Sequence, residues 1–412
     1  ALWTTSIDDD LVEGRLSFQR GDVALQLGLF DTSERELDRA VRALDRSEAL
    51  PQERARFLAR RGTLARLRGD LQGSSDYFRA AAAALAQSEA DPVDAAFTSA
   101  RIDDEGSYAA LAKGDFESAI VASTTAIAAY RDYQKRRDVD ATFRIARASL
   151  RLAVAYAFRG LAVPYRRPLP ATLVVPGHAP RADLRGLDIK HADEELAAVM
   201  AQLTSPGSGL VSGSSAVRGL LREARLVSSY IAHDPQHALE LAERAAHDAR
   251  FDYQRAESHT GRAHALLRLG RHEAALEALD TAAELLAKAR DVVTRVIGVR
   301  DGDLGESGDL GLVAQVAIYR AAAQLAVADQ ANAAETLCVA LEDEGLARFH
   351  EGLLRTFGEV AETVSPAWRR HRRLRALLGM NGTGPSTPAR LPDALVAAWR
   401  SRSSERREGD VG

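Results

Sequence analysis

The sequence predicts an all-α protein, an α-solenoid of stacked antiparallel helical hairpins in two blocks separated by a proline-rich insertion. The main observation is a recurring pattern, clearest over residues 61–81, where Gly62 precedes a tight turn at Gly69-Asp70 and Ala81 follows it. The composition agrees, because 46% of residues are hydrophobic, only 6% are aromatic, and alanine, the best helix former, is abundant. Small residues on both sides of a turn indicate two helices in close contact.

Length and charge exclude several classes of protein. A chain of 412 residues exceeds one ordinary core, which favours several domains or a repeat array. The net charge of −4 argues against nonspecific nucleic-acid binding, so nucleic acid is not an expected partner. Cys338 is the one cysteine, which excludes a disulfide framework and a cysteine-based zinc site.

The location of the protein is expected only by default. No apolar run reaches the ~20 residues of a membrane helix, so no membrane span is expected and the default location is cytoplasmic. Because the chain starts with Ala1 instead of Met, we expect its N-terminus to have been processed or trimmed. A removed signal peptide would leave no trace in this sequence.

Capping residues predict where the first helices begin. Asp8-Asp9-Asp10 predicts a helix over about 10–26, because acidic residues favour a helix N-terminus. The segment 31–34, Asp-Thr-Ser-Glu, is expected to cap the second helix. Pro51 opens the third at a first-turn position, where proline is well tolerated.

Turn glycines repeat at a regular distance. Gly28, Gly69 and Gly114 are 41 and 45 residues apart, and alanines follow them at matching places, Ala40, Ala81 and Ala126. Helical hairpins at this spacing bury their apolar faces on one another and form an α-solenoid.

These turns resemble those of the tetratricopeptide repeat (TPR). Good copies of its Gly-Asp-aromatic turn are Arg-Gly-Asp-Leu at 68–71 and Lys-Gly-Asp-Phe at 113–116; Leu269-Gly270-Arg271-His272 is another, and the turns near His233 and Asp329 are weak copies. The resemblance covers about two thirds of the chain, in two blocks. The period is longer than the usual ~34 residues, which is similar to repeats of bacterial regulators and signalling proteins. The alternative is a nonrepeating all-α bundle.

A proline-rich segment interrupts the repeats. A helix is expected over about 139–161, and five of the thirteen prolines follow between Pro164 and Pro180, which excludes a continuous helix there. Residues 171–175, Ala-Thr-Leu-Val-Val, form a short β-like run. The insertion is either an ordered surface linker or an arm that covers one groove of the solenoid.

The second block begins with a helix expected near 191. More helices are expected over about 214–345, broken near 300–309, and a capping helix starts at Ser365-Pro366. The predicted organisation is N-terminal repeats (1–160), an insertion or linker (161–190), C-terminal repeats with the capping helix (191–380) and a flexible tail (381–412).

Two clusters of possible ligands fail on geometry, so no metal ion or other cofactor is expected. His233 and His237 have the i,i+4 spacing of a helical zinc site, but Asp234-Pro235 predicts a helix start between them. In the acidic loop 301–312, Glu306 and Leu312 stand where a calcium loop needs glycine and glutamate. A nucleotide-binding glycine loop and a nucleophile elbow are absent from the sequence.

A non-catalytic interaction scaffold, not an enzyme, is therefore the first expectation, with a peptide or protein partner on the concave face of the solenoid. The alternative is a ligand- or peptide-responsive sensor domain of a bacterial signalling or transcription-control protein, with the 161–190 insertion as hinge or lid. The candidate partner-binding residues are Arg56, Arg61, Tyr108 and Arg262 on first helices of hairpins, and Arg369, Arg372 and Arg373 in an arginine-rich cluster. That cluster is either a solvated helix face or a contact for an acidic partner, a phosphate group or nucleic acid. Neither partner identity nor oligomeric state follows from the sequence.

Overall fold

A computed structural model describes most of the chain up to residue 336. The described residues are 9–26, 30–46, 51–67, 70–89, 91–113, 115–162, 181–205, 214–297, 309–329, 331–333 and 335–336. Within these ranges every regular element is a helix and none is a strand, which confirms the all-α prediction. The chain divides into two compact units. The main part of the first ends at Ala155, and the second takes in Tyr156–Thr204, Val211–Val292 and the residues from Gly308 on.

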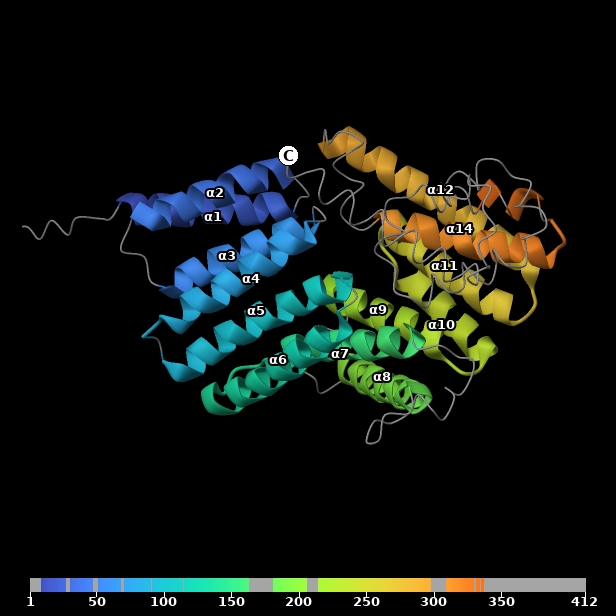
Figure 1. Cartoon of the computed structure of the whole chain (residues 1–412), viewed down its shortest axis with the longest axis horizontal. Coiled ribbons are helices and arrows are strands. Elements are labelled where there is room, and N and C mark those ends of the chain that lie inside the picture. Colours follow the sequence, from blue (N-terminus) through green and yellow to red (C-terminus); the bar gives the residue numbers. More distant parts are fainter. Residues whose placement is uncertain are drawn as a thin grey trace, which may run out of the picture. The chain divides into compact units, whose positions relative to one another are not determined.

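Three helical hairpins and most of a seventh helix form the first unit (Figure 1). Each even-numbered helix packs antiparallel on the preceding odd-numbered one, and α2 and α4 also pack on the first helix of the next hairpin. The helices are α1 (Asp9–Gln26), α2 (Phe30–Arg46), α3 (Pro51–Leu67), α4 (Leu71–Ala86), α5 (Pro92–Lys113), α6 (Phe116–Arg137) and α7 (Thr142–Ala162).

The repeat pattern is visible at the atomic level. A Cβ atom on Gly62 would lie 3.1 Å from the Phe78 ring, and one on Gly21 would lie 2.9 Å from Leu37, so both glycines allow two helices to approach closely. In the same two hairpins, the hydroxyl of Ser33 donates to the Gly21 carbonyl (2.9 Å). The next repeat has the same bond at 2.8 Å, from Ser74 to the Gly62 carbonyl.

Aspartate caps explain where the second helices begin. Asp70 accepts a hydrogen bond from the Gly73 backbone N–H (2.8 Å), and Asp115 accepts one from Ser118 (3.1 Å). Each side chain satisfies one of the backbone donors that a helix start leaves unpaired. Asp70 and Asp115 therefore cap the helices that follow the predicted turns, a role that was not predicted for them from the sequence.

The second unit contains the end of α7, α8 (Arg181–Thr204), α9 (Ser215–Ile231), α10 (Pro235–Asp248), α11 (Asp252–Arg268), α12 (His272–Ile297) up to Val292, and α14 (Asp309–Ala326). Its core holds the fully buried side chains of Leu266, Leu279 and Ile318, surrounded by alanines. Between α11 and α12, Gly270 has a φ of 72°, and the Arg271 N–H bonds the Leu266 carbonyl at 2.9 Å. Glycine suits this left-handed helix end because it has no Cβ atom.

Two helix starts differ from the sequence expectations. Helix α8 begins at Arg181, ten residues before the expected position near 191, because helix is possible directly after Pro180, the last proline of the insertion. Helix α2 begins at Phe30, so residues 31–34 lie inside its first turn and do not precede it. The Ser33 hydroxyl is used instead to bond the Gly21 carbonyl of the neighbouring helix.

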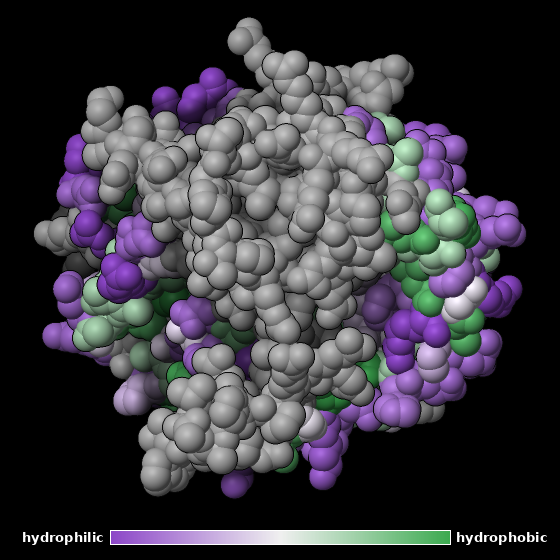
Figure 2. All heavy atoms as spheres, turned by 45° about the vertical axis from the view of Figure 1, so that its right-hand side comes forward, coloured by the Kyte–Doolittle hydropathy of each residue, from purple (hydrophilic) through white to green (hydrophobic). Residues whose placement is uncertain are grey.

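Several expected features lie outside the described residues. They are the β-like run at 171–175, the loop near 300–308, Cys338, the capping helix near 366 and the tail. On the face drawn in Figure 2, the described residues present mostly hydrophilic side chains, with smaller hydrophobic areas between them. No helix in the described part of the chain is long and apolar enough to cross a membrane.

Candidate functional site

The odd-numbered helices of the first unit line a hollow of 320 Å³, which we call the first-unit groove. All of its residues come from α1, α3, α5 and α7, so it runs across successive hairpins. They are Phe18, Gln19, Asp22, Arg56, Ala59, Arg60, Thr63, Thr98, Arg101, Ile102, Glu105, Arg144 and Arg147.

Positive charge dominates the first-unit groove. Five arginines face two carboxylates, which leaves a formal charge of +3 (5 − 2) in a chain whose net charge is −4. Both carboxylates are paired, Asp22 with Arg60 at 2.6 Å and Glu105 with Arg147 at 3.3 Å.

The groove arginines differ in their pairing. In the described part of the chain, no ion pair joins Arg56, Arg101 or Arg144 to a carboxylate. Burial lowers the pKa of Arg101, and the positive charges of Arg144 and Arg56 lower it further. The guanidinium groups are therefore close enough to repel one another.

Two of these arginines lie over aromatic rings. The guanidinium carbon of Arg56 lies 5.9 Å from the centre of the Phe18 ring, and that of Arg144 lies 5.4 Å from the centre of the Phe97 ring. Such cation–π contacts fix the plane of a guanidinium group without using its N–H donors.

A buried ionic cluster lies next to the groove. Asp104 is fully buried on α5 and forms ion pairs with Arg147 and Arg151 of α7. The Tyr108 ring lies between Arg151, at 3.7 Å, and Arg66 of α3, at 5.0 Å. This cluster connects three of the helices that line the groove.

The acid beside this cluster stays ionised. Burial alone would raise the pKa of Glu105, but Arg151, Arg147 and Arg66 lower it below its ordinary value. Glu105 therefore neutralises part of the positive charge of the groove and offers no proton for acid catalysis near neutral pH.

The candidate residues predicted from the sequence lie at different places in the structure. Arg56 lies in the groove. Arg61 points instead toward α2 and α4, where it pairs with Asp38 (2.9 Å) and donates to the Tyr77 hydroxyl (2.8 Å). Tyr108 lies in the ionic cluster, and Arg262 lies in the second unit, 3.6 Å from Glu243. Arg369, Arg372 and Arg373 lie outside the described residues.

Sequence reasoning missed Arg101 and Arg144. A usable signal existed for Arg101: it follows Arg56 by 45 residues (101 − 56), the same distance as between Gly69 and Gly114. Arg56 and Arg101 therefore occupy equivalent positions in consecutive repeats. A search for cations that recur at the repeat period would have found them.

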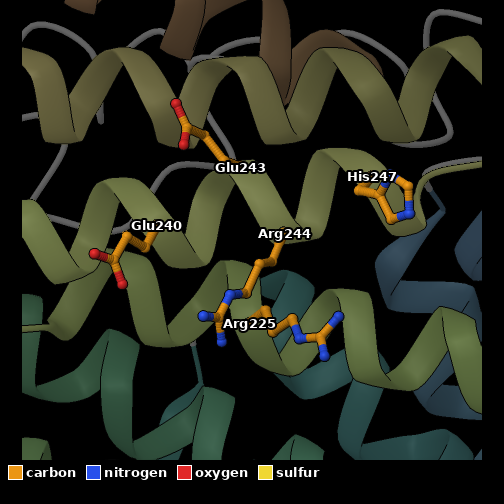
Figure 3. Close-up of a pocket in the computed structure, with 5 residues that line it drawn as sticks. All are labelled: Arg225, Glu240, Glu243, Arg244 and His247. Carbon is orange, nitrogen blue, oxygen red and sulfur yellow. The ribbon is translucent and has the colours of Figure 1, made fainter.

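A second, more open cavity of similar size lies in the second unit (Figure 3). Its charges are nearly balanced, since Arg225, Arg244 and His247 face Glu240 and Glu243. In Figure 3 the side chain of Glu243 points away from those of Arg225 and Arg244. Arg225 pairs with Asp248 and Glu243 with Arg262, so this cavity offers less free charge than the first-unit groove.

The second unit also has an aromatic cluster on α9, α11 and α14. The His264 ring lies 5.4 Å from the Tyr230 ring and 5.3 Å from the Tyr319 ring, measured between centroids. Burial, and to a lesser extent the charge of Arg268, lower the pKa of His264 to about 4, so this imidazole is neutral near pH 7.

Metal-ligating side chains do not converge within the described ranges, where no three His, Cys, Asp or Glu residues form a group that could hold an ion. His233 precedes α10, which begins at Pro235 after the capping residue Asp234. The two histidines with i,i+4 spacing therefore do not share a helix. The acidic loop at 301–308 lies outside the described residues.

Comparison with known proteins identifies the fold. No family model and no curated protein sequence matches the chain. The apo form of the quorum sensor NprR from B. thuringiensis is similar in structure, with a TM-score of 0.50 and 13% identity over 92% of this chain and 90% of that one. The Rap protein complexed with Competence and Sporulation Factor gives a TM-score of 0.42 at 13% identity over 87% and 99% of the two chains. Yeast Tom70 gives 0.24 at 11% over 95% and 96%.

The likeness to NprR in structure agrees with the hairpin contacts described above. The chain is an all-α solenoid with a TPR-like fold, as the turn motifs predict.

Proposed function

We propose that this chain is a non-catalytic interaction module that binds a peptide or an extended protein segment in the first-unit groove. The observation that carries the proposal is the lining of this groove by four successive odd-numbered helices. A hollow that continues across repeats suits an elongated ligand, because each repeat adds contacts of the same kind. Its volume of 320 Å³ is at the lower end for a ligand pocket.

The groove chemistry favours binding over catalysis. Its two carboxylates, Asp22 and Glu105, are both engaged with arginines, so neither stands ready as a general base. Arginine stays protonated near neutral pH, which suits it to recognition and not to proton transfer. We therefore propose that the partner is a protein or a peptide. We also propose that the chain acts in the cytoplasm.

A sensor domain is the second candidate function. NprR, which shares the fold, is described as a quorum sensor, and an independent second unit offers a part that a ligand could reposition. The proposed hinge or lid, residues 161–190, lies largely outside the described residues. Compaction in small-angle scattering when a peptide binds would favour this function, and an unchanged radius of gyration would count against it.

A display selection tests the interaction module. Random peptides displayed on phage are selected against the whole chain, and the enriched peptides are then measured with two variants. Thr98→Trp places an indole in the groove, and among the described residues it breaks no hydrogen bond between helices, because the Thr98 hydroxyl donates to the Asp94 carbonyl of its own helix (3.0 Å). The matched control is Thr124→Trp, at an exposed position on α6.

We expect the enriched peptides to lose at least about tenfold in affinity for Thr98→Trp. Their affinity for Thr124→Trp is expected to stay within about twofold of the original chain. Equal affinity for both tryptophan variants, or no enriched peptide, would contradict the proposal.

A further inference from the structure

We propose that the occupant of the first-unit groove is an acidic peptide segment, whose aspartate or glutamate carboxylates pair with Arg56, Arg101 and Arg144. This inference rests on the proposed function and specifies the chemistry of its partner. It follows from the charges, the positions of the aromatic rings and the size of the groove.

The pairing of the groove arginines separates structural from available charge. Arg60 and Arg147 are already bound, to Asp22 and to the pair Asp104 and Glu105. Arg56, Arg101 and Arg144 have no carboxylate partner within the described residues. These three cations line the same groove, where the charges of Arg56 and Arg144 act on Arg101, and a ligand that supplies carboxylates offsets that repulsion.

The three arginines are also prepared for a ligand. Arg56 lies over Phe18 and Arg144 over Phe97, so both guanidinium groups are oriented before anything binds. Preorganisation of this kind lowers the entropy cost of forming a bidentate pair with a carboxylate. Arg101 lies one repeat after Arg56 at the equivalent position, which places donors along the direction of an extended chain.

An acidic peptide fits the molecule better than a nucleic acid does. The net charge of the chain is −4, so a long polyanion meets repulsion outside the groove. Within a hollow of 320 Å³ there is room for a few side chains, and the three free charges match a short acidic segment.

Defined probes test the charge preference directly. We would measure fluorescence anisotropy with a labelled peptide of alternating glutamate and alanine, the same peptide with glutamine in place of glutamate, and an oligothymidine of similar length. The groove variant is Arg101→Gln/Arg144→Gln. The control Arg79→Gln/Arg136→Gln removes the same charge from exposed positions on α4 and α6, where each arginine pairs only within its own helix.

We expect the glutamate peptide to bind at least about tenfold more tightly than the glutamine peptide, and more weakly as salt is raised. The groove variant should lose that preference, and the control should retain it within about twofold. A glutamine peptide that binds equally well, an equal loss in the control variant, or tighter binding of the oligothymidine would overturn the inference.

The two proposals fail in different ways. If selected neutral peptides bind and Thr98→Trp abolishes their binding, the groove is a peptide site and only the acidic inference fails. If Thr98→Trp leaves binding of every peptide unchanged, the groove is not the site and both proposals fail.

Discussion

Asp104→Asn removes the negative charge at the centre of the ionic cluster of the first unit. Asp104 is 0% exposed, and its partner Arg151 is 3% exposed. The asparagine has nearly the same shape and keeps one oxygen as an acceptor, so the change isolates the charge. Within the described residues, Arg151 would then remain as a buried cation without an ion-pair partner.

The expected cost follows from the burial of the two arginines. Loss of one partner from a buried ion pair costs about 3–5 kcal/mol. Arg147 is 25% exposed and keeps Glu105 at 3.3 Å, so Arg151 alone carries the penalty. We therefore expect a loss of about 3 kcal/mol from the free energy of unfolding of the first unit. For a unit of this size, that corresponds to a fall in Tm of about 6–12 °C.

Urea unfolding followed by circular dichroism measures the loss, and hydrogen exchange locates it in α5 and α7. The control is Asp132→Asn, which removes an exposed carboxylate paired with Arg136 on α6 and should change stability by less than about 0.5 kcal/mol. Adding Arg151→Met to Asp104→Asn should restore part of the loss, because it removes the orphaned cation. A loss below about 1 kcal/mol, or no restoration by the second change, would refute this reasoning.

Two further predictions concern packing and pH. Gly21→Ala should destabilise the first unit by about 1–3 kcal/mol, because the new Cβ would lie 2.9 Å from Leu37. Gly219→Ala, whose Cβ would have nothing within 4 Å, should stabilise α9 by about 0.5–1 kcal/mol. Thermal unfolding of both variants checks the difference, and a stability change of the same sign in both would contradict it. Burial lowers the pKa of His264 to about 4, below its unfolded value near 6.5, so the unfolded chain binds more protons in this range and stability should fall by up to about 3 kcal/mol as the pH drops from about 6.5 to 4. His264→Phe keeps the ring and should remove that part of the pH dependence in urea unfolding; an unchanged pH dependence would show that other groups cause it.

The hairpins were predictable because a few local residues determine them. Gly62 and Phe78 must touch for two helices to pack, and Asp70 must cap the helix that follows the turn. Such requirements recur at every repeat, so they appear in the sequence as a period. The start of α8 at Arg181 was not predicted, because the nonhelical insertion was expected to continue to residue 190, ten residues beyond its last proline, Pro180.

The site was only partly predictable because side chains of neighbouring residues on a helix point in directions about 100° apart. Arg60 lies in the groove, while its neighbour Arg61 points toward α2 and α4. The sequence indicates which helices come first in their hairpins but leaves the rotation of each helix undetermined. Pairing is equally hidden, since the contact of Arg147 with Asp104 joins residues 43 positions apart.

A binding role for the groove predicts a conflict between stability and function at Arg101. Burial and the charges of Arg144 and Arg56 all lower the pKa of Arg101, so its charged form is held at a cost to the folded state. Arg101→Gln should therefore stabilise the chain while weakening the binding of acidic peptides.

The matched variant is Arg60→Gln, which breaks the 2.6 Å pair with Asp22 and should not stabilise the chain. Urea unfolding of the two variants, beside the anisotropy measurement, separates the alternatives. An arginine kept for the fold would lower stability when removed, so a less stable Arg101→Gln would contradict the assignment of this residue to ligand binding.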